Sequence, residues 1–221
     1  IALICGIVPS LALLTYFTKP ANAASLTLSG ITTMQEMTPY ICDNSTVGET
    51  NTLTDIRDES TYTVAKLSDS KCWMTQNLRI VDKEITPEDS DVTENFTIPA
   101  SSDPWDDTGG VETNKVYYAG NAVNGAYYSW YVATVNSGTA ELTGGNAPSS
   151  ICPKGWKLPR TTEYETLKDL GTAKVGDWNT ATDTGYWIGG AEEGSNGAAF
   201  FPAAGLVYTG TLSDVGTHGR Y

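Results

Sequence analysis

The sequence predicts an α+β fold that is rich in short strands and loops and has one or two short helices. Residues 61–66, TYTVAK, alternate in side-chain character with a period of two, as a half-buried strand does. Residues 158–171 contain the clearest helix, because Thr162 and Glu165 have capping-box spacing and Gly171 suits the position after a helix. The 22 glycines in 221 residues supply the turns that short strands need.

The first half of the chain predicts further elements in order. Residues 25–30 alternate like a strand, and residues 33–37 predict a short helix that Pro39 ends. Residues 52–78 predict a meander of antiparallel strands. Its turns are expected at residues 58–60 and 68–70.

The second half alternates between polar segments and aromatic runs. Residues 82–114 are polar and rich in turn residues, which predicts a long surface loop, and residues 136–150 predict another. Aromatic and branched side chains favour strands in the remaining runs. These runs are residues 115–120, 125–135, 185–190 and 198–208.

The formal net charge is −13 and the sequence pI is about 4.3. Phosphate backbones need a basic surface, so this balance argues against nucleic-acid binding. It argues equally against an anionic membrane surface as the partner. An acidic, soluble surface suits an exported protein.

The N-terminus predicts export. Residues 1–17 form an apolar run without a charge, and Ala21-Asn22-Ala23 fits the small-x-small rule for cleavage after Ala23. We therefore predict a signal peptide over residues 1–23, with a retained hydrophobic helix that anchors the protein as the alternative. Membrane contact is expected only through this segment, and the protein is expected to be extracellular or on the cell surface. No Met and no basic stretch precede the run, so the sequence is expected to start inside a longer reading frame.

The cysteines raise a pairing question. Cleavage after Ala23 would remove Cys5 and leave Cys42, Cys72 and Cys152, which is an odd number. One thiol is then free, or its partner lies outside this chain. Pairing of Cys42 with Cys72 closes a loop of thirty residues, worth ~3–4 kcal/mol by the chain-entropy argument. The alternative is that Lys71 lowers the pKa of Cys72 and makes it a nucleophile.

Several blocks together carry a family resemblance. They are TDIRDESTYTVAKLSDSKCWMTQNLR, YYSW, ICPKGWKLPRTTEYETL, TGYWIGG and FFPAAG, in that order. This series resembles the Fibrobacter succinogenes major paralogous domain family of exported bacterial proteins, over roughly residues 50–221. The domain is accordingly assigned to residues 49–221, after a short segment at residues 24–48.

The resemblance implies a C-type-lectin-like fold. CPKGW at Cys152–Trp156 and WIGG at Trp187–Gly190 are similar to motifs of that fold superfamily. The expected domain is strand-rich, with long loops, and follows the N-terminal hydrophobic helix. Members of the family continue to a late cysteine, so the resemblance implies a truncated C-terminus and a missing partner for Cys152.

Catalytic constellations are sparse. His218 is the only histidine and lies in a glycine-rich turn, which leaves a hydrolytic triad without a base. No zinc-ligand spacing occurs. Ser68 and Lys71 match a Ser-x-x-Lys pattern but lack its companion motifs. GWKLPRTTEYE is also similar to formylglycine-generating enzymes, yet no cysteine follows Cys152 to complete their cysteine pair.

Polar and aromatic loop residues are the candidate binding residues. Acidic side chains among glycines suit Ca²⁺, although their spacing is not that of an EF-hand. A tryptophan in a polar loop suits stacking on a sugar, and one Trp-Asn pair is similar to part of a lectin motif. We expect Trp73, Trp130, Trp156 and Trp187 to be core residues instead. The candidate binding residues are Trp105, Asp106, Asp107, Trp178, Asn179, Glu192 and Glu193.

The expected function is that of an exported, non-catalytic surface domain whose loops bind a glycan or a protein. No cofactor is expected, apart from the possible Ca²⁺. The alternatives are an enzyme related to the formylglycine-generating branch and a structural envelope component tethered by the N-terminal helix.

Overall fold

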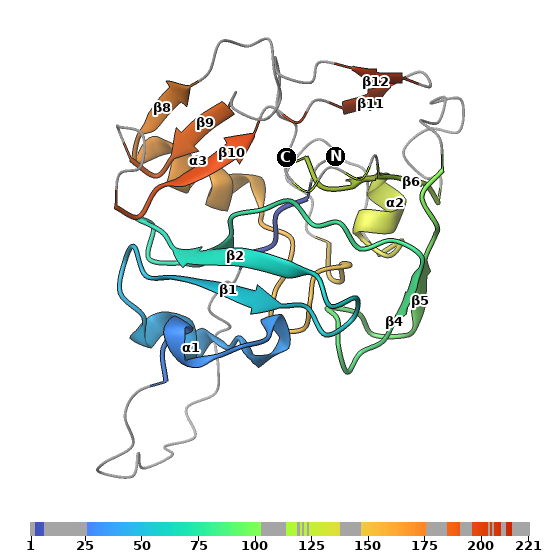
Figure 1. Cartoon of the computed structure of the whole chain (residues 1–221), viewed down its shortest axis with the longest axis horizontal. Coiled ribbons are helices and arrows are strands. Elements are labelled where there is room, and N and C mark those ends of the chain that lie inside the picture. Colours follow the sequence, from blue (N-terminus) through green and yellow to red (C-terminus); the bar gives the residue numbers. More distant parts are fainter. Residues whose placement is uncertain are drawn as a thin grey trace.

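The computed structural model describes residues 3–6, 26–102, 114–118, 120, 122, 124–137, 147–175, 185–190, 196–202, 204, 206–208 and 211–213. Over these residues the fold is α+β, with many short strands and few short helices, as predicted (Figure 1). Within the same residues, no helix has the length and apolar character needed to cross a membrane.

The first elements are helical turns. They are the 3₁₀ turns η1 (Leu28–Gly30) and η2 (Met34–Glu36) and the helix α1 (Pro39–Asn44). The predicted strand at residues 25–30 is wrong, because side chains rather than a neighbouring strand satisfy this backbone. The Leu28 N–H donates to Ser45 Oγ at 2.8 Å, and Asn51 Nδ2 donates to the Leu28 carbonyl. The short helix predicted at residues 33–37 is present as the 3₁₀ turn η2, which ends before Pro39. Pro39 itself begins α1, since its missing N–H costs nothing at the first helical position.

A three-stranded antiparallel sheet follows, in the order β1-β2-β3. Its strands are β1 (Thr50–Thr54), β2 (Thr61–Lys66) and β3 (Cys72–Met74). The predicted strand at residues 61–66 is confirmed, and Tyr62 and Val64 point into the core. Figure 1 shows β1 and β2 side by side at the centre of the molecule, with α1 beside β1.

The middle of the chain differs most from the sequence prediction. The predicted loop at residues 82–114 contains an antiparallel hairpin of β4 (Lys83–Ile85) and β5 (Phe96–Ile98). The predicted strand at residues 125–135 divides into β7 and a short helix, because Ser129 caps the helix through its hydroxyl, which accepts the Val132 N–H at 3.3 Å. The elements here are β6 (Val116–Tyr117), β7 (Tyr127–Tyr128) and α2 (Trp130–Ala133).

The last part pairs the helix α3 (Thr161–Asp169) with a second sheet, of strand order β10-β9-β8. Leu167 and Tyr164 of α3 pack on this sheet, where Tyr164 meets Phe201 edge-on at 5.7 Å between ring centroids. The strands are β8 (Thr172–Val175), β9 (Gly185–Ile188) and β10 (Ala199–Pro202), followed by the hairpin β11 (Leu206–Tyr208) and β12 (Thr211–Ser213).

The start of α3 is two residues earlier than predicted. The N-cap is Arg160 rather than Thr162, and Glu163 Oε2 accepts the Arg160 N–H at 2.9 Å. The arginine side chain has no acceptor, so this is only half of a capping box. Gly171 does follow the helix with φ of +130°, as predicted for this position.

The apolar N-terminus enters the core. Residues Leu3–Gly6 are buried and not helical, and they lie between the two hydrophobic clusters of the domain. Leu3 and Cys5 belong to the larger cluster and Ile4 to the smaller. The remainder of the predicted leader helix and its cleavage site at Ala23 lie outside the described residues.

Two disulfides hold the domain together, and all four cysteines take part. Cys42 and Cys72 are joined, as the sequence predicts. Cys152 is joined to Cys5, 147 positions earlier, so its expected pairing with a cysteine missing from this chain is wrong. The physical reason is that Leu3–Gly6 runs through the core, which brings Cys5 next to Cys152 with a Cα–Cα distance of 5.9 Å.

Candidate functional site

Cys72 is a structural residue. Its disulfide with Cys42 is buried, and the ammonium next to it belongs to Lys66, which pairs with Cys72 across β2 and β3. Lys66 Nζ donates to the carbonyls of Cys42 at 2.9 Å, Asp43 at 3.2 Å and Ser45 at 3.0 Å. A cation at the end of α1 satisfies carbonyls that the helix leaves open. The alternative of a nucleophilic thiol activated by Lys71 is therefore not what the structure shows.

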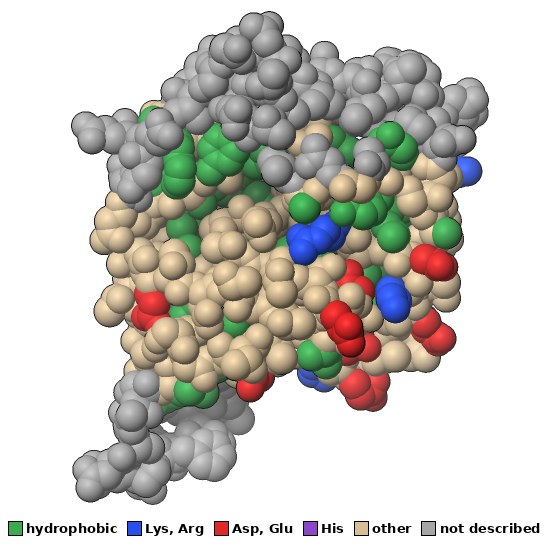
Figure 2. Space-filling view, in the orientation of Figure 1, with side chains coloured by type: hydrophobic (Ala, Val, Ile, Leu, Met, Phe, Trp, Pro, Cys, Tyr) green, Lys and Arg blue, Asp and Glu red, His purple; other side chains and the backbone are tan. Residues whose placement is uncertain are grey.

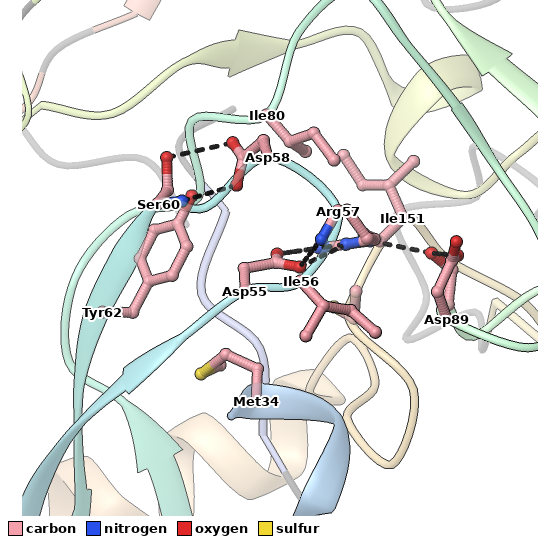
Figure 3. A network of polar contacts seen from close by, with 12 residues as sticks. Met34, Asp55, Ile56, Arg57, Asp58, Ser60, Tyr62, Ile80, Asp89 and Ile151 are labelled. Atoms are coloured by element: carbon pink, nitrogen blue, oxygen red, sulfur yellow. Dashed lines mark hydrogen bonds and ion pairs between the residues drawn. The ribbon is translucent and has the colours of Figure 1, made fainter. Parts of the chain in front are cut away.

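A buried ion pair follows β1 in the chain (Figure 3). Arg57 Nη2 lies 2.6 Å from Asp55 Oδ2, and the exposed fractions of the two side chains are 1% and 0%. Arg57 Nη1 also donates to Ser90 Oγ at 2.9 Å and to the Ile151 carbonyl at 2.7 Å. Asp55 Oδ1 accepts from Gln35 Nε2 at 2.8 Å.

These hydrogen bonds connect four parts of the chain that are distant in sequence, at Gln35, Asp55–Arg57, Ser90 and Ile151. These hydrogen bonds each have a charged donor or acceptor, and a buried ion pair needs such bonds to offset its desolvation. The sequence predicts a turn at residues 58–60 but no ion pair between Asp55 and Arg57. Its one available signal was an aspartate and an arginine two residues apart at a strand end, which is too short to be specific.

A second charged cluster surrounds Glu163 at the start of α3. Lys71 Nζ lies 3.6 Å and Lys157 Nζ 3.7 Å from Glu163 Oε1. Burial lowers the pKa of Lys157, against the opposing effect of Glu163, and the nearby charges of Arg160 and Lys71 lower it further. Lys71 is thus engaged with α3 and not with a thiol.

The Ser68–Lys71 turn is structural as well. Ser68 Oγ donates to the Gly197 carbonyl at 3.1 Å, away from any Ser-x-x-Lys chemistry. Asp69 accepts the Trp73 indole N–H at 3.1 and 3.0 Å on its two oxygens and the Lys71 backbone N–H at 3.0 Å. Burial raises the pKa of Asp69 despite these bonds.

Among the carboxyl groups of the described residues, Asp91 has the most strongly raised pKa. Burial raises its pKa to about 6, opposed by the hydrogen bond from Ser150 Oγ at 2.7 Å and by the charge of Lys157. Its backbone N–H donates to the Cys152 carbonyl at 2.9 Å, and its carbonyl accepts from the Ser150 N–H at 2.7 Å. Asp91 therefore clamps the segment that carries the Cys5–Cys152 disulfide.

The core tryptophans follow the prediction in part. Trp73 and Trp156 are fully buried, and the Trp156 indole donates to the Met34 carbonyl at 2.8 Å. Trp130 and Trp187 are only half-buried, and Trp187 faces Phe200 at 5.9 Å between ring centroids.

All seven candidate binding residues lie outside the described residues, namely Trp105, Asp106, Asp107, Trp178, Asn179, Glu192 and Glu193. The strands that flank them are described. Residues 176–184 connect β8 to β9, and residues 191–195 connect β9 to β10. The two connections are thus joined to opposite ends of β9. In the part of the chain that the structure describes, no group of three or more His, Cys, Asp or Glu is placed to hold a metal ion.

The surface shows no single charged patch on the face drawn in Figure 2. Acidic and basic side chains are intermixed on its right-hand side, and few charges lie on its left.

The sequence model of the Fibrobacter succinogenes major domain matches residues 69–209, more than half of the chain. No curated protein and no solved structure matches.

Proposed function

Because the chain belongs to the Fibrobacter succinogenes major domain family, we propose that it is an exported bacterial surface domain that binds a glycan or protein ligand without catalysis. The observation that carries the proposal is the buried disulfide Cys42–Cys72, which lies outside the predicted leader. Disulfides persist in oxidising compartments outside the cytosol. A cross-linked scaffold with long connections between its strands supports the proposal of a binding domain.

The scaffold lowers the cost of binding. Strands β9 and β10 and helix α3 share one apolar cluster, and β8 pairs with β9. The segments 176–184 and 191–195 connect these three strands. Loops held at both ends by a rigid sheet lose less freedom when a ligand binds. Trp178 and Trp105 supply stacking surfaces for a sugar, and Asp106, Asp107, Glu192 and Glu193 supply polar contacts or ligands for Ca²⁺.

We extend the proposal to a C-type-lectin-like fold. Its support is the placement of the two motifs that predict it. Trp156 of CPKGW is buried with its indole bonded, Cys152 is in a disulfide, and WIGG forms the central strand β9 and the turn after it. An experimental structure in which α3 and β8–β10 do not superpose on that fold would reject this part.

The two alternatives meet specific obstacles. An enzyme of the formylglycine-generating type needs reactive cysteines, whereas all four cysteines here are in disulfides. A tether through the N-terminal helix needs residues 1–17 to lie in a membrane, whereas Leu3–Gly6 lies in the core of the domain.

The test is a binding screen of the full chain against arrayed glycans and purified surface proteins, with and without Ca²⁺. A hit should be weakened at least about tenfold by Trp105→Ala or Trp178→Ala. Tyr40→Ala, on the exposed face of α1, is the matched control and should leave binding unchanged. Silence in every array, or hits that the two loop variants and the control variant bind as strongly as the wild type, would reject the proposal.

A further inference from the structure

Residues Leu3–Gly6 occupy a slot between β3 and the segment around Lys157. The backbone of the slot holds them on both sides, as in a sheet. On one side the Cys5 carbonyl accepts the Met74 N–H at 3.1 Å, and the Leu3 carbonyl accepts the Leu78 N–H at 2.9 Å. On the other side Gly6 and Lys157 exchange two hydrogen bonds, of 2.8 and 2.9 Å.

The side chains alternate between two apolar environments. Leu3 and Cys5 point into the larger cluster and Ile4 into the smaller, and all three are at most 4% exposed. A Cβ built on Gly6 would lie 3.5 Å from the Trp73 ring, an ordinary contact, so a small side chain also fits there. The slot therefore selects the pattern apolar, apolar, cysteine, small.

Cys152 bonds the segment in the slot covalently to the domain. Its sulfur is joined to Cys5, its carbonyl is held by the Asp91 N–H, and the residue is completely buried. We propose that this slot is a strand-acceptor site in which Leu3–Gly6 is an exchangeable occupant. The partner is an extended protein segment of the same pattern, which displaces Leu3–Gly6 and becomes disulfide-bonded to Cys152.

The chemistry is a thiol–disulfide exchange and needs no external oxidant. The thiolate of the incoming cysteine attacks Cys152 Sγ, the bond between the Cys5 and Cys152 sulfurs breaks, and Cys5 leaves as a thiolate. That thiolate takes up the proton that the incoming thiol gave up. Because both sulfurs are buried, the step requires Leu3–Gly6 to open locally.

Leu3–Gly6 competes with a partner segment for the slot. Leu3–Gly6 belongs to the same chain as the slot, so its binding there is intramolecular and an external segment must compete with a high effective concentration. A partner strand prevails when the occupant is loosened or removed. Cleavage after Ala23, which the sequence predicts, would remove it together with Cys5 and leave Cys152 without its partner.

The test uses the full chain with Cys5→Ser, in which Cys152 is free and the occupant is held without a covalent bond. The probe is a synthetic peptide Ala-Leu-Ile-Cys-Gly-Ile whose cysteine is activated as a thiopyridyl disulfide. Control peptides carry the same activated cysteine with the order of the other residues scrambled, or with aspartate in place of leucine. Coupling to Cys152, located by peptide mass mapping, should be at least about tenfold faster for the matched peptide than for either control.

Two further measurements keep the test decisive. Adding Leu3→Asp to Cys5→Ser should speed coupling of the matched peptide, since it weakens the occupant. The wild-type protein, which needs no substitution to fold, should form the same adduct at Cys152 in a glutathione redox buffer with the unactivated peptide. Equal coupling of all peptides, or no adduct in either protein, would overturn the proposal. Ligand binding by the loops does not enter these measurements, so the outcome is independent of the proposed function.

Discussion

Arg57 places its guanidinium against the Asp55 carboxylate, with 2.6 Å between Nη2 and Oδ2 and both side chains shielded from solvent. The pair joins the end of β1 to Ser90 and to the backbone of Ile151, far along the chain. Removing one partner leaves an uncompensated buried charge, which costs far more than the pair contributes.

Asp55→Asn is therefore expected to lower the free energy of unfolding by ~3–5 kcal/mol. The double variant Asp55→Leu/Arg57→Met should recover much of that loss, because it leaves no buried charge unpaired. Urea denaturation followed by circular dichroism gives both values. A double variant as unstable as Asp55→Asn would show that the network's hydrogen bonds, and not the charge balance, dominate.

Lys66→Met should destabilise the protein by ~1–3 kcal/mol, since three carbonyls at the end of α1 lose their charged donor while the aliphatic packing is retained. Lys83→Met is the matched control, because Lys83 is exposed on β4 and should change stability by less than ~0.5 kcal/mol. Equal losses in the two variants would contradict the capping role of Lys66. The same urea titration measures both.

The raised pKa of Asp91 predicts a pH dependence. The carboxyl holds its proton more tightly in the folded chain, with a pKa of about 6, than in the unfolded chain, at ~3.9. Its stabilising contribution is fully present below pH ~4 and is lost as the pH rises through about 6. Partial solvent screening limits the effect to ~1 kcal/mol.

Asp91→Asn isolates this contribution from that of Asp69, whose pKa is also raised. The asparagine keeps an acceptor for Ser150 and does not ionise. Relative to wild type, the variant should gain free energy of unfolding between pH 4 and pH 7. A difference that stays constant over that range would contradict the assignment.

The two disulfides should contribute unequally. The chain-entropy argument gives ~3.5 kcal/mol for the separation of 30 between Cys42 and Cys72 and ~5 kcal/mol for the separation of 147 between Cys5 and Cys152. The paired variants Cys42→Ala/Cys72→Ala and Cys5→Ala/Cys152→Ala should follow that order in thermal and urea unfolding. The reverse order would show that strain or residual structure outweighs loop closure.

Much of the fold and part of its covalent frame were predictable from the sequence. The strand at residues 61–66 and the helix around Leu167 were predictable because their side-chain periods are visible in the local sequence. Pairing of Cys42 with Cys72 was predictable because thiols in one small exported domain usually pair and Cys152 was assigned to another partner. The candidate binding residues stay predictions, since they lie outside the described residues.

Contacts between distant segments were decided only by tertiary structure. The N-cap of α3 is Arg160 and not the predicted Thr162. Lys71 and Lys157, from two other parts of the chain, lie next to Glu163 and favour it as the residue that accepts the N-cap N–H. In the same way Cys152 forms a disulfide with Cys5 because the apolar N-terminal segment, which the sequence predicts to be a leader, fills the slot beside β3. By itself the sequence determined the elements with a local period or cap. The core determined the partners, because burial brings together residues that no spacing along the chain relates.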